Sequence, residues 1–212
     1  MAGFTFFFNP MSRAQIARWA LHEVSADYDP VFVPWDDRPA ALLAANGMGK
    51  LPTIIHHTNE GDHVITECAA VCHYLAQATH SPLLPQSGEM ADYFRWLFFG
   101  AGPLEQAVIS HSMKWEVTDR TQEMMVGFGS YERTMDVLEN WLKTHDFICG
   151  NRFTMADVYV GSQVDWGVSF KTMPERPGFL AYAERVRQRP AYQEAKAIDN
   201  ALIAEMKAGT SG

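Results

Sequence analysis

The chain has 212 residues, of which 47% are hydrophobic, and a formal net charge of -8. This length allows one large or two small domains with a substantial core. The negative charge argues against a general attraction to nucleic acid or anionic membranes, so we expect a small molecule or a protein as partner. No apolar run approaches the roughly 20 residues that span a bilayer. Three cysteines are too few for a secreted disulfide framework, so we expect a cytoplasmic protein.

The first 80 residues mix strand and helix patterns. A strand is predicted at Phe4 to Phe8, followed by a helix that Ser12 opens, and a second strand is predicted at Tyr28 to Val33. After a further helix come two strand-like runs, separated by turn-forming residues, and a last helix; these three elements are predicted at 51–56, 63–66 and 67–76. The order β-α-β-α-β-β-α predicts a mixed sheet, since the first unit is parallel and the hairpin antiparallel. This is the thioredoxin-like order.

Beyond residue 88 only helical patterns follow. The segment 81–89 contains two prolines and a glycine and is predicted to be a linker. The helical patterns cover 90–118, 121–144, 155–170, 178–188 and 191–206. Pro103 lies inside the first of them and is expected to kink it, because proline lacks a backbone donor. We therefore predict a domain at 1–80, an all-helical domain at 90–207 and a flexible tail at 208–212.

Two short segments of the first domain suggest a ligand site. Gly49-Lys50-Leu51-Pro52-Thr53 has a proline at a strand start, where an ordinary turn proline is also common. Glu67 and Cys68 begin the last helix of this domain, and the free N–H groups of a helix start favour an anion. Together with the change from mixed strand and helix patterns to helical patterns at the linker, these segments resemble the soluble glutathione transferase family. The similarity extends over nearly the whole chain and is greatest to bacterial members of uncertain class.

The resemblance implies a fold and a ligand. The fold is an α/β thioredoxin-like N-terminal domain followed by an all-α C-terminal domain, with a cleft between them, and the expected assembly is a homodimer. Glutathione is the implied co-substrate, and no metal is implied. In this family the proline of Leu51-Pro52 is cis, and the residue before it pairs its backbone with the cysteinyl unit of glutathione. Glutathione-binding positions fall on Lys50, Leu51, Pro52, Glu67 and Cys68.

Cys68 departs from the family pattern, in which a serine stands beside the acidic residue. A thiol is a weaker donor than a hydroxyl, although the backbone N–H of Cys68 remains. This replacement puts the affinity for glutathione in question. Cys68 and Cys72 are one helical turn apart, and we interpret them as small apolar residues in preference to a redox pair.

The residue that activates the glutathione thiol is expected in the turn after the first strand. A thiol pKa near ~8.5 must fall by about two units, which corresponds to ~2.7 kcal/mol of thiolate stabilisation. Phe7 stands where many classes carry tyrosine, which excludes the tyrosine mechanism. The candidates are Asn9, at the serine position of the plant tau class, and Ser12, the nearest hydroxyl. Ser12 also fits a capping box with Gln15, and Asn9 also fits an ordinary turn residue.

In the helical domain, Gly150 to Asp157 resembles the core helix signature of the family. Thr154 is predicted to cap the helix and Asp157 to lie near the positive end of its dipole, which is a role in folding. The second substrate, a small apolar electrophile, is expected against this domain. Its candidate contacts, which are more simply core or dimer residues, are Phe98, Phe99, His111, Met113, Trp115, Trp166 and Phe170.

The last two predicted strands form a hairpin with three histidines. It can be interpreted as a metal site or as an ordinary solvated surface, and the second interpretation is favoured. His56 and His57 are adjacent and so point to opposite faces of a strand, and with His63 no cysteine or carboxylate completes a tetrahedral set. We therefore interpret the hairpin as solvated.

The leading functional prediction is a detoxifying transferase that conjugates the thiolate of glutathione to a small hydrophobic electrophile. One alternative is a glutathione-dependent peroxidase or disulfide reductase on the same fold. Another is a non-catalytic binding or regulatory protein, which the missing tyrosine and Cys68 make credible.

Overall fold

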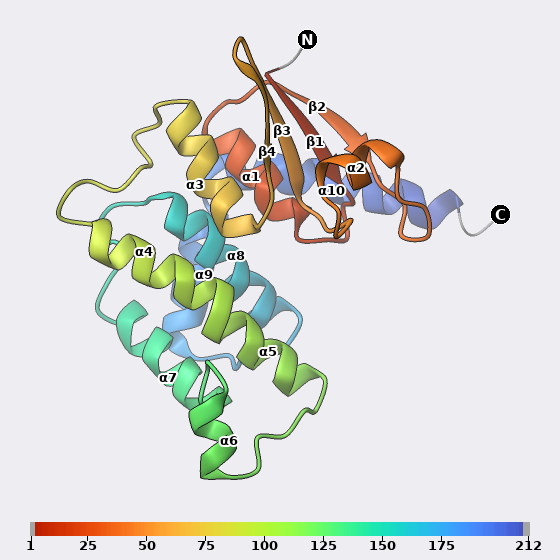
Figure 1. The fold of residues 1–212 in the computed structure, drawn as a ribbon. Helices are drawn as coiled ribbons and strands as arrows, with labels where there is room; N and C mark the ends of the chain where they lie inside the picture. Colours follow the sequence, from red (N-terminus) through yellow and green to blue (C-terminus); the bar gives the residue numbers. More distant parts are fainter. Residues whose placement is uncertain (1–2, 210–212) are drawn as a thin grey trace. The chain divides into compact units, whose positions relative to one another are not determined.

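A computed structural model describes residues 3–209, which form two compact units. Unit 1 comprises residues 3–81 together with residues 188–209, and unit 2 comprises residues 82–187. Unit 1 thus contains both ends of the described chain, coloured red to yellow and blue in Figure 1.

Unit 1 is built on a four-stranded mixed sheet. The strands are β1 (Phe4–Phe8), β2 (Tyr28–Phe32), β3 (Thr53–Thr58) and β4 (Gly61–Ile65), in the spatial order β2-β1-β3-β4. β1 is parallel to β2 and antiparallel to β3, and β3 and β4 form a hairpin. This is the predicted thioredoxin-like arrangement, with the hairpin turn shortened to two residues.

The helices of unit 1 cover both faces of the sheet (Figure 1). They are α1 (Ala14–Glu23), α2 (Ala40–Ala45) and α3 (Cys68–Ala78). Successive residues of β1 point to opposite faces. Phe7 packs with Val33 and with Leu42 of α2, whereas Phe6 and Phe8 lie beneath the guanidinium of Arg18 on α1. The aromatic run at the N-terminus is therefore buried on both sides.

The last helix, α10 (Pro190–Gly209), packs against α1 and belongs to unit 1. Trp19 and Tyr192 meet edge to face with ring centroids 5.1 Å apart. The contact-based division therefore differs from the predicted one, which placed this region in the helical domain at 90–207. The helix also includes residues 208 and 209 of the predicted tail, while residues 210–212 lie outside the described part of the chain.

Unit 2 is entirely helical in the residues that the structure describes. Its elements are α4 (Met90–Phe99), the π-helical turn η1 (Gly100–Leu104), α5 (Glu105–Ser112), α6 (Arg120–Met125), α7 (Tyr131–Leu142), α8 (Met155–Ser169) and α9 (Pro177–Arg187). Pro103 lies within η1, so the predicted irregularity takes the form of a wider helical turn. The predicted helix 121–144 is interrupted between α6 and α7, where Gly129 has a φ of +68°.

The start of α8 has the predicted capping box of Thr154 and Asp157. Asp157 is fully buried, and its carboxylate accepts hydrogen bonds from the N–H groups of Ile148 at 2.7 Å and Thr154 at 2.8 Å. The hydroxyl of Tyr182 donates to it at 2.8 Å. Burial nevertheless raises the pKa of Asp157 to about 6, because removal from water penalises the charged form. The residue thus joins α8 to α9 and to the loop before α8.

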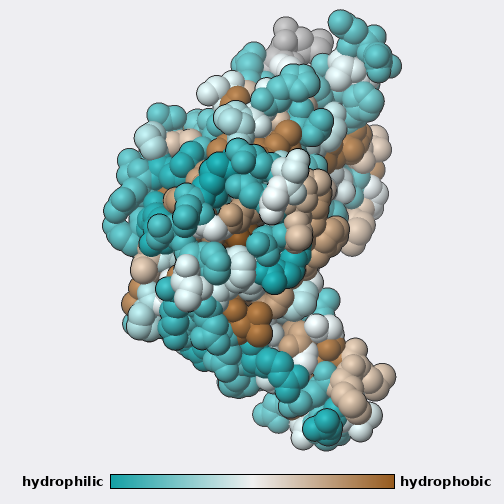
Figure 2. Space-filling view, turned by 90° about the vertical axis from the view of Figure 1, so that its left-hand side faces the viewer, coloured by the Kyte–Doolittle hydropathy of each residue, from teal (hydrophilic) through white to brown (hydrophobic). Residues whose placement is uncertain are grey.

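The surface is mainly polar on the face drawn in Figure 2, where hydrophilic residues dominate and hydrophobic atoms form smaller areas. None of the helices within residues 3–209 combines the length and hydropathy needed to cross a lipid bilayer.

Candidate active site

The turn between β1 and α1 is organised around the carbonyl of Asn9. This oxygen accepts the N–H of Ser12 at 3.0 Å and the hydroxyl of Ser12 at 2.8 Å. The Ser12 hydroxyl in turn accepts the N–H of Ala14 at 3.1 Å, which satisfies one of the free donors at the start of α1. Ser12 is half-buried, so its hydroxyl is held in the turn and remains accessible from solvent.

The side chain of Asn9 is fully buried and serves the turn. Its Nδ2 donates to the carbonyl of Val33 at 3.0 Å, and its Oδ1 accepts the N–H of Met11 at 2.9 Å. These bonds tie the turn to the end of β2 and match the alternative interpretation of Asn9 as a turn residue. Its burial does not suit the predicted role of thiolate donor, whereas the position of Ser12 does. The part that either residue plays in catalysis stays a prediction.

The predicted capping box of Ser12 and Gln15 does not form. The side chain of Gln15 donates to the carbonyl of Pro10 and accepts from Lys196, while the N–H of Ser12, which the box would pair with Gln15, donates to the carbonyl of Asn9. Helix α1 begins one residue later than such a box requires, with Arg13 at the N-cap position. The Ser12 hydroxyl therefore caps through Ala14 alone.

The Leu51-Pro52 peptide bond is cis, as the resemblance implied. Leu51 is half-buried, and in residues 3–209 no hydrogen bond engages its main-chain N–H or C=O. The carbonyl of the preceding residue, Lys50, is different, since it accepts from Thr53 Oγ1 at 2.9 Å and from Asn46 Nδ2 at 3.2 Å. Asn46 and Thr53 thus hold the loop at Lys50, while the main-chain N–H and C=O of Leu51 have no hydrogen-bond partner among residues 3–209.

The start of α3 lies beside the turn after β1. The thiol of Cys68 is 3.7 Å from the carbonyl oxygen of Arg13, within the range of a weak S–H···O contact. Glu67, at the N-cap, is exposed and makes no side-chain cap, and the positive end of the α3 dipole at this point favours an anion. Sequence spacing did not indicate the Cys68–Arg13 contact, because it joins residues 55 positions apart.

Glu67 has an unusual backbone conformation, with φ +63° and ψ +116°. A non-glycine residue in this region stores of order 1 to 3 kcal/mol of strain and is typically found where function requires it. One turn further on, Cys72 is completely buried, and burial raises the pKa of its thiol well above the usual value, with Cys68 adding to the effect. Cys72 is therefore a core residue, whereas Cys68 is half-buried at the helix start.

A thioredoxin-like sheet unit with a cis proline before β3, followed by a helical unit, defines the class of protein, and family models agree with it. The glutathione S-transferase N-terminal domain matches residues 10–78, and the glutathione S-transferase C-terminal domain matches residues 76–190. The chain belongs to the glutathione S-transferase family. The predicted family and fold class are thereby confirmed.

Individual relatives are distant. Glutathione S-transferase 1 of Schizosaccharomyces pombe is 30% identical over 69% of this chain and 66% of its own length, slightly less than two thirds. The disulfide-bond oxidoreductase YghU of Escherichia coli is 24% identical over 85% of this chain and 67% of its own length. A glutathione transferase of Phanerochaete chrysosporium, solved with oxidized glutathione, is 19% identical with a TM-score of 0.75, covering 94% of this chain and 97% of that one. The last likeness shows the fold.

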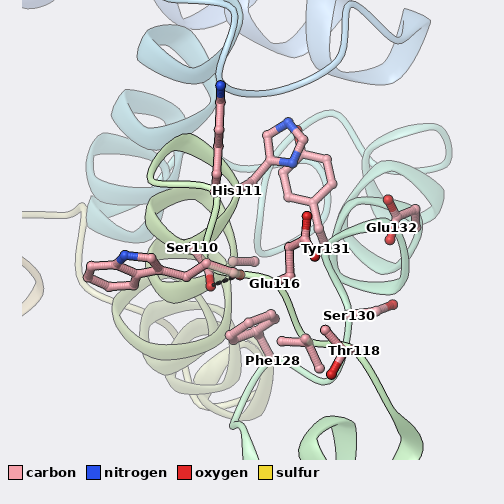
Figure 3. A pocket seen from close by; sticks show the side chains of 12 residues that line it. Ser110, His111, Glu116, Thr118, Phe128, Ser130, Tyr131 and Glu132 are labelled. Atoms are coloured by element: carbon pink, nitrogen blue, oxygen red, sulfur yellow. Dashed lines mark hydrogen bonds between the residues drawn. The ribbon is translucent and has the colours of Figure 1, made fainter.

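The predicted contacts of a second substrate lie in unit 2, but only two of them share a pocket. His111 and Trp115 line a pocket between the end of α5 and the start of α7 (Figure 3). Phe98 is 72% exposed and Phe170 is 71% exposed, and neither lines that pocket. Tyr131, which does line it, was missed, because the helical pattern over 121–144 hid the break before α7.

The histidines of the β3–β4 hairpin are engaged in local contacts. The Nδ1 of His56 is 3.0 Å from the Tyr74 hydroxyl, and that of His57 is 2.8 Å from Asp62 Oδ1. Burial lowers the pKa of His56. Within residues 3–209 no three His, Cys, Asp or Glu side chains gather as a metal site would require.

Proposed function

We propose that this chain is a glutathione transferase that binds glutathione on unit 1 and conjugates its thiolate to a small hydrophobic electrophile. The observation that carries the proposal is the 3.7 Å contact between Cys68 and the Arg13 carbonyl. It brings the start of α3, where the positive end of the helix dipole suits a carboxylate, next to the turn that contains Ser12. The S. pombe relative is itself named a glutathione S-transferase.

Three elements of unit 1 offer the contacts that glutathione needs. The unengaged N–H and C=O of Leu51 can pair with a peptide backbone in the manner of a short strand. The positive end of the α3 dipole can favour the γ-glutamyl carboxylate, and Glu67 can accept a hydrogen bond from the neighbouring amine. Lys50 is exposed next to Leu51 and can face the second carboxylate.

Ser12 is the proposed thiolate donor. Its hydroxyl can rotate from the carbonyl of Asn9 towards a sulfur without leaving that carbonyl unpaired, because the N–H of Ser12 still donates to it at 3.0 Å. A hydrogen bond to a charged group contributes about 1.5 to 3 kcal/mol, which matches the ~2.7 kcal/mol required to lower the thiol pKa by two units. The hydroxyl is thereby sufficient for the proposed chemistry.

The test is to compare Ser12→Ala with Ser112→Ala, a control at an exposed serine of α5. The pKa of bound glutathione is read from the ultraviolet absorbance of the thiolate, and turnover from conjugation of a model aryl halide. We expect Ser12→Ala to raise the thiol pKa by about one to two units and to lower the rate by about 10- to 100-fold, with nearly unchanged glutathione affinity. An unshifted pKa would contradict the role of Ser12, and absence of glutathione binding by the parent protein would contradict the proposal as a whole.

Glutathione-dependent reduction of a disulfide is the second candidate function, because the E. coli relative is named a disulfide-bond oxidoreductase and Cys68 places a thiol at the same site. In this reaction two glutathione thiols become one glutathione disulfide while the substrate disulfide becomes two thiols. The test is reduction of a model dialkyl disulfide by the parent protein and by Cys68→Ser. Equal rates indicate that glutathione alone cycles, and loss of the rate in the variant indicates that the protein thiol takes part.

The assembly and the place of action are also part of the proposal. We propose a homodimer in the cytoplasm, for which sedimentation of the purified protein is the direct test of the dimer. A monomer at micromolar concentration that retains full turnover would contradict it.

A further inference from the structure

A pocket of about 570 Å³ lies entirely within unit 2 and is separate from the residues assigned to glutathione. Its volume falls in the range of roughly 300 to 1,000 Å³ that small-molecule sites occupy. The walls come from the end of α5, the segment between α5 and α6, and the start of α7, as Figure 3 shows. Three parts of the chain thus converge on one opening.

One wall of the pocket is a fixed aromatic stack. The rings of His111 and Tyr131 lie nearly parallel, with centroids 4.0 Å apart and an interplanar angle of 14°. The hydroxyl of Tyr131 donates to the carbonyl of Thr172 at 2.9 Å, and this bond holds the Tyr131 ring of the stack in place. A rigid flat surface of this kind favours a planar ligand, because few rotamers are lost on binding.

A second aromatic group is exposed on an anchored backbone. Trp115 is 61% exposed. Its main-chain N–H donates to the carbonyl of Ser110 at 2.9 Å, and its main-chain carbonyl accepts the Ser110 hydroxyl at 3.0 Å. The residue before it, Lys114, holds a tight turn with a φ of +57°. Phe128 adds a half-buried ring on the opposite segment. The main chain of Trp115 is therefore fixed beside the pocket, and its side chain is exposed there.

The pocket is lined by more negative than positive side chains. Glu116 and Glu132 supply two carboxylates and Lys114 supplies one ammonium group. None of the ion pairs within residues 3–209 includes these three side chains. The whole chain has a net charge of -8, so its long-range field attracts cations.

From the aromatic walls and the acidic lining we infer that this pocket binds a small planar aromatic compound that carries an ammonium group. The ring stacks on the aromatic surfaces, and the ammonium group pairs with Glu116 or Glu132. This site does not depend on the proposed glutathione chemistry.

The test uses three probes of the same ring and different charge: 2-naphthylmethylamine, 2-naphthylmethanol and 2-naphthoate, titrated by calorimetry at neutral pH. We expect the amine to bind about 3- to 10-fold tighter than the alcohol, and the carboxylate to bind most weakly. Equal affinities, or tighter binding of the carboxylate, would overturn the proposed ligand class.

Matched variants locate the site. Glu116→Gln combined with Glu132→Gln should weaken the amine by about 3- to 10-fold and leave the alcohol unchanged, whereas Lys114→Gln should strengthen the amine by about 2-fold. Trp115→Ala should weaken both probes by about 3- to 10-fold, and Trp35→Ala, at a half-exposed tryptophan of unit 1, should weaken neither. Melting curves establish that each variant is folded, and Phe128→Leu replaces Trp115→Ala if the latter is not.

Glutathione serves as the competitor that separates the two sites. With saturating glutathione the affinity for the amine should change by less than about 2-fold, since the two ligands use different residues. Displacement of the amine by glutathione, or equal losses in Trp115→Ala and Trp35→Ala, would overturn the location.

Discussion

The Nε of Arg18 lies 2.9 Å from Oδ1 of Asp199, and both side chains are 2% exposed. Arg18 also donates to the hydroxyl of Tyr28 at 3.0 Å and lies 4.4 Å above the ring centroid of Phe8. Asp199 is thus the counter-ion of a guanidinium that is buried among aromatic rings. Because Asp199 belongs to α10 and Arg18 to α1, this ion pair holds α10 in unit 1.

Breaking this ion pair on one side should destabilise unit 1 strongly. We expect Asp199→Asn to lower the free energy of unfolding by about 3 to 5 kcal/mol, because it leaves the Arg18 charge buried without a counter-ion. The double variant Arg18→Met with Asp199→Leu should lose less than the single variant, since no buried charge remains. Denaturant titration of the parent protein and the two variants measures both values, and a double variant at least as unstable as Asp199→Asn would contradict this account.

Substitution of Glu67, whose backbone is strained, by glycine should change the free energy of unfolding and the affinity for glutathione in opposite directions. Glu67→Gly removes the Cβ that makes a φ of +63° unfavourable, so we expect the free energy of unfolding to rise by up to about 1 kcal/mol. Glutathione affinity should fall in this variant, because the carboxylate is lost. Glu67→Gln is the control: it retains the strain and should lose affinity with little change in stability. If glycine destabilises the protein, the conformation of Glu67 is not strained.

The buried carboxylate of Asp157 should give stability a characteristic dependence on pH. Its pKa is raised to about 6 in the folded protein from an ordinary value of 3.8, so the folded state binds the proton more tightly. The contribution of this group is therefore most favourable below pH 4, and it falls by at most about 3 kcal/mol as the pH rises from 4 to 6. The difference in unfolding free energy between the parent protein and Asp157→Asn, measured across this range, should show that fall. A difference that is flat, or that grows with pH, would contradict the raised pKa.

Replacement by alanine should have different effects on protein stability at two glycines of the π-helical turn η1. A Cβ on Gly100 would lie 2.9 Å from Cε1 of Tyr159, whereas one on Gly102 meets nothing within 4 Å. We expect Gly100→Ala to destabilise by about 1 to 3 kcal/mol through overpacking. Gly102→Ala should be neutral or stabilise by up to about 1 kcal/mol, because alanine favours helix. Thermal unfolding of the two variants is the measurement, and equal melting temperatures would be inconsistent with the close packing of α8 on η1.

Local patterns predicted the sheet unit and the start of α8 well, since their signals are short and independent. The aromatic run of β1, the turn residues of the hairpin and the Thr154–Asp157 cap each depend on neighbours in sequence. The same logic failed at 121–144, where apolar spacing continued through Gly127 and Gly129 and concealed the break before α7. Pro103 indicated an irregular helix, but whether the chain bends or widens there depends on the packing of Tyr159 against Gly100.

Within the candidate site, the sequence singled out three segments and left the roles of their residues open. Asn9 and Ser12 were equal candidates for the thiolate donor, and their difference is one of burial, which Val33 and the end of β2 determine. Likewise the assignment of α10 to unit 1 depends on a pairing across 181 positions, which no local pattern contains.

The sharing of unit 1 between residues 3–81 and 188–209 has a consequence for synthesis on the ribosome. Residues 82–187 form a continuous stretch, so unit 2 can fold as soon as it has emerged. Unit 1 must wait for α10, and until then Arg18 has no counter-ion and the α10-facing surface of α1 is uncovered. Residues 3–81 are therefore made before unit 2 but completed after it, and during that interval the uncovered surface of α1 exposes apolar side chains that can aggregate.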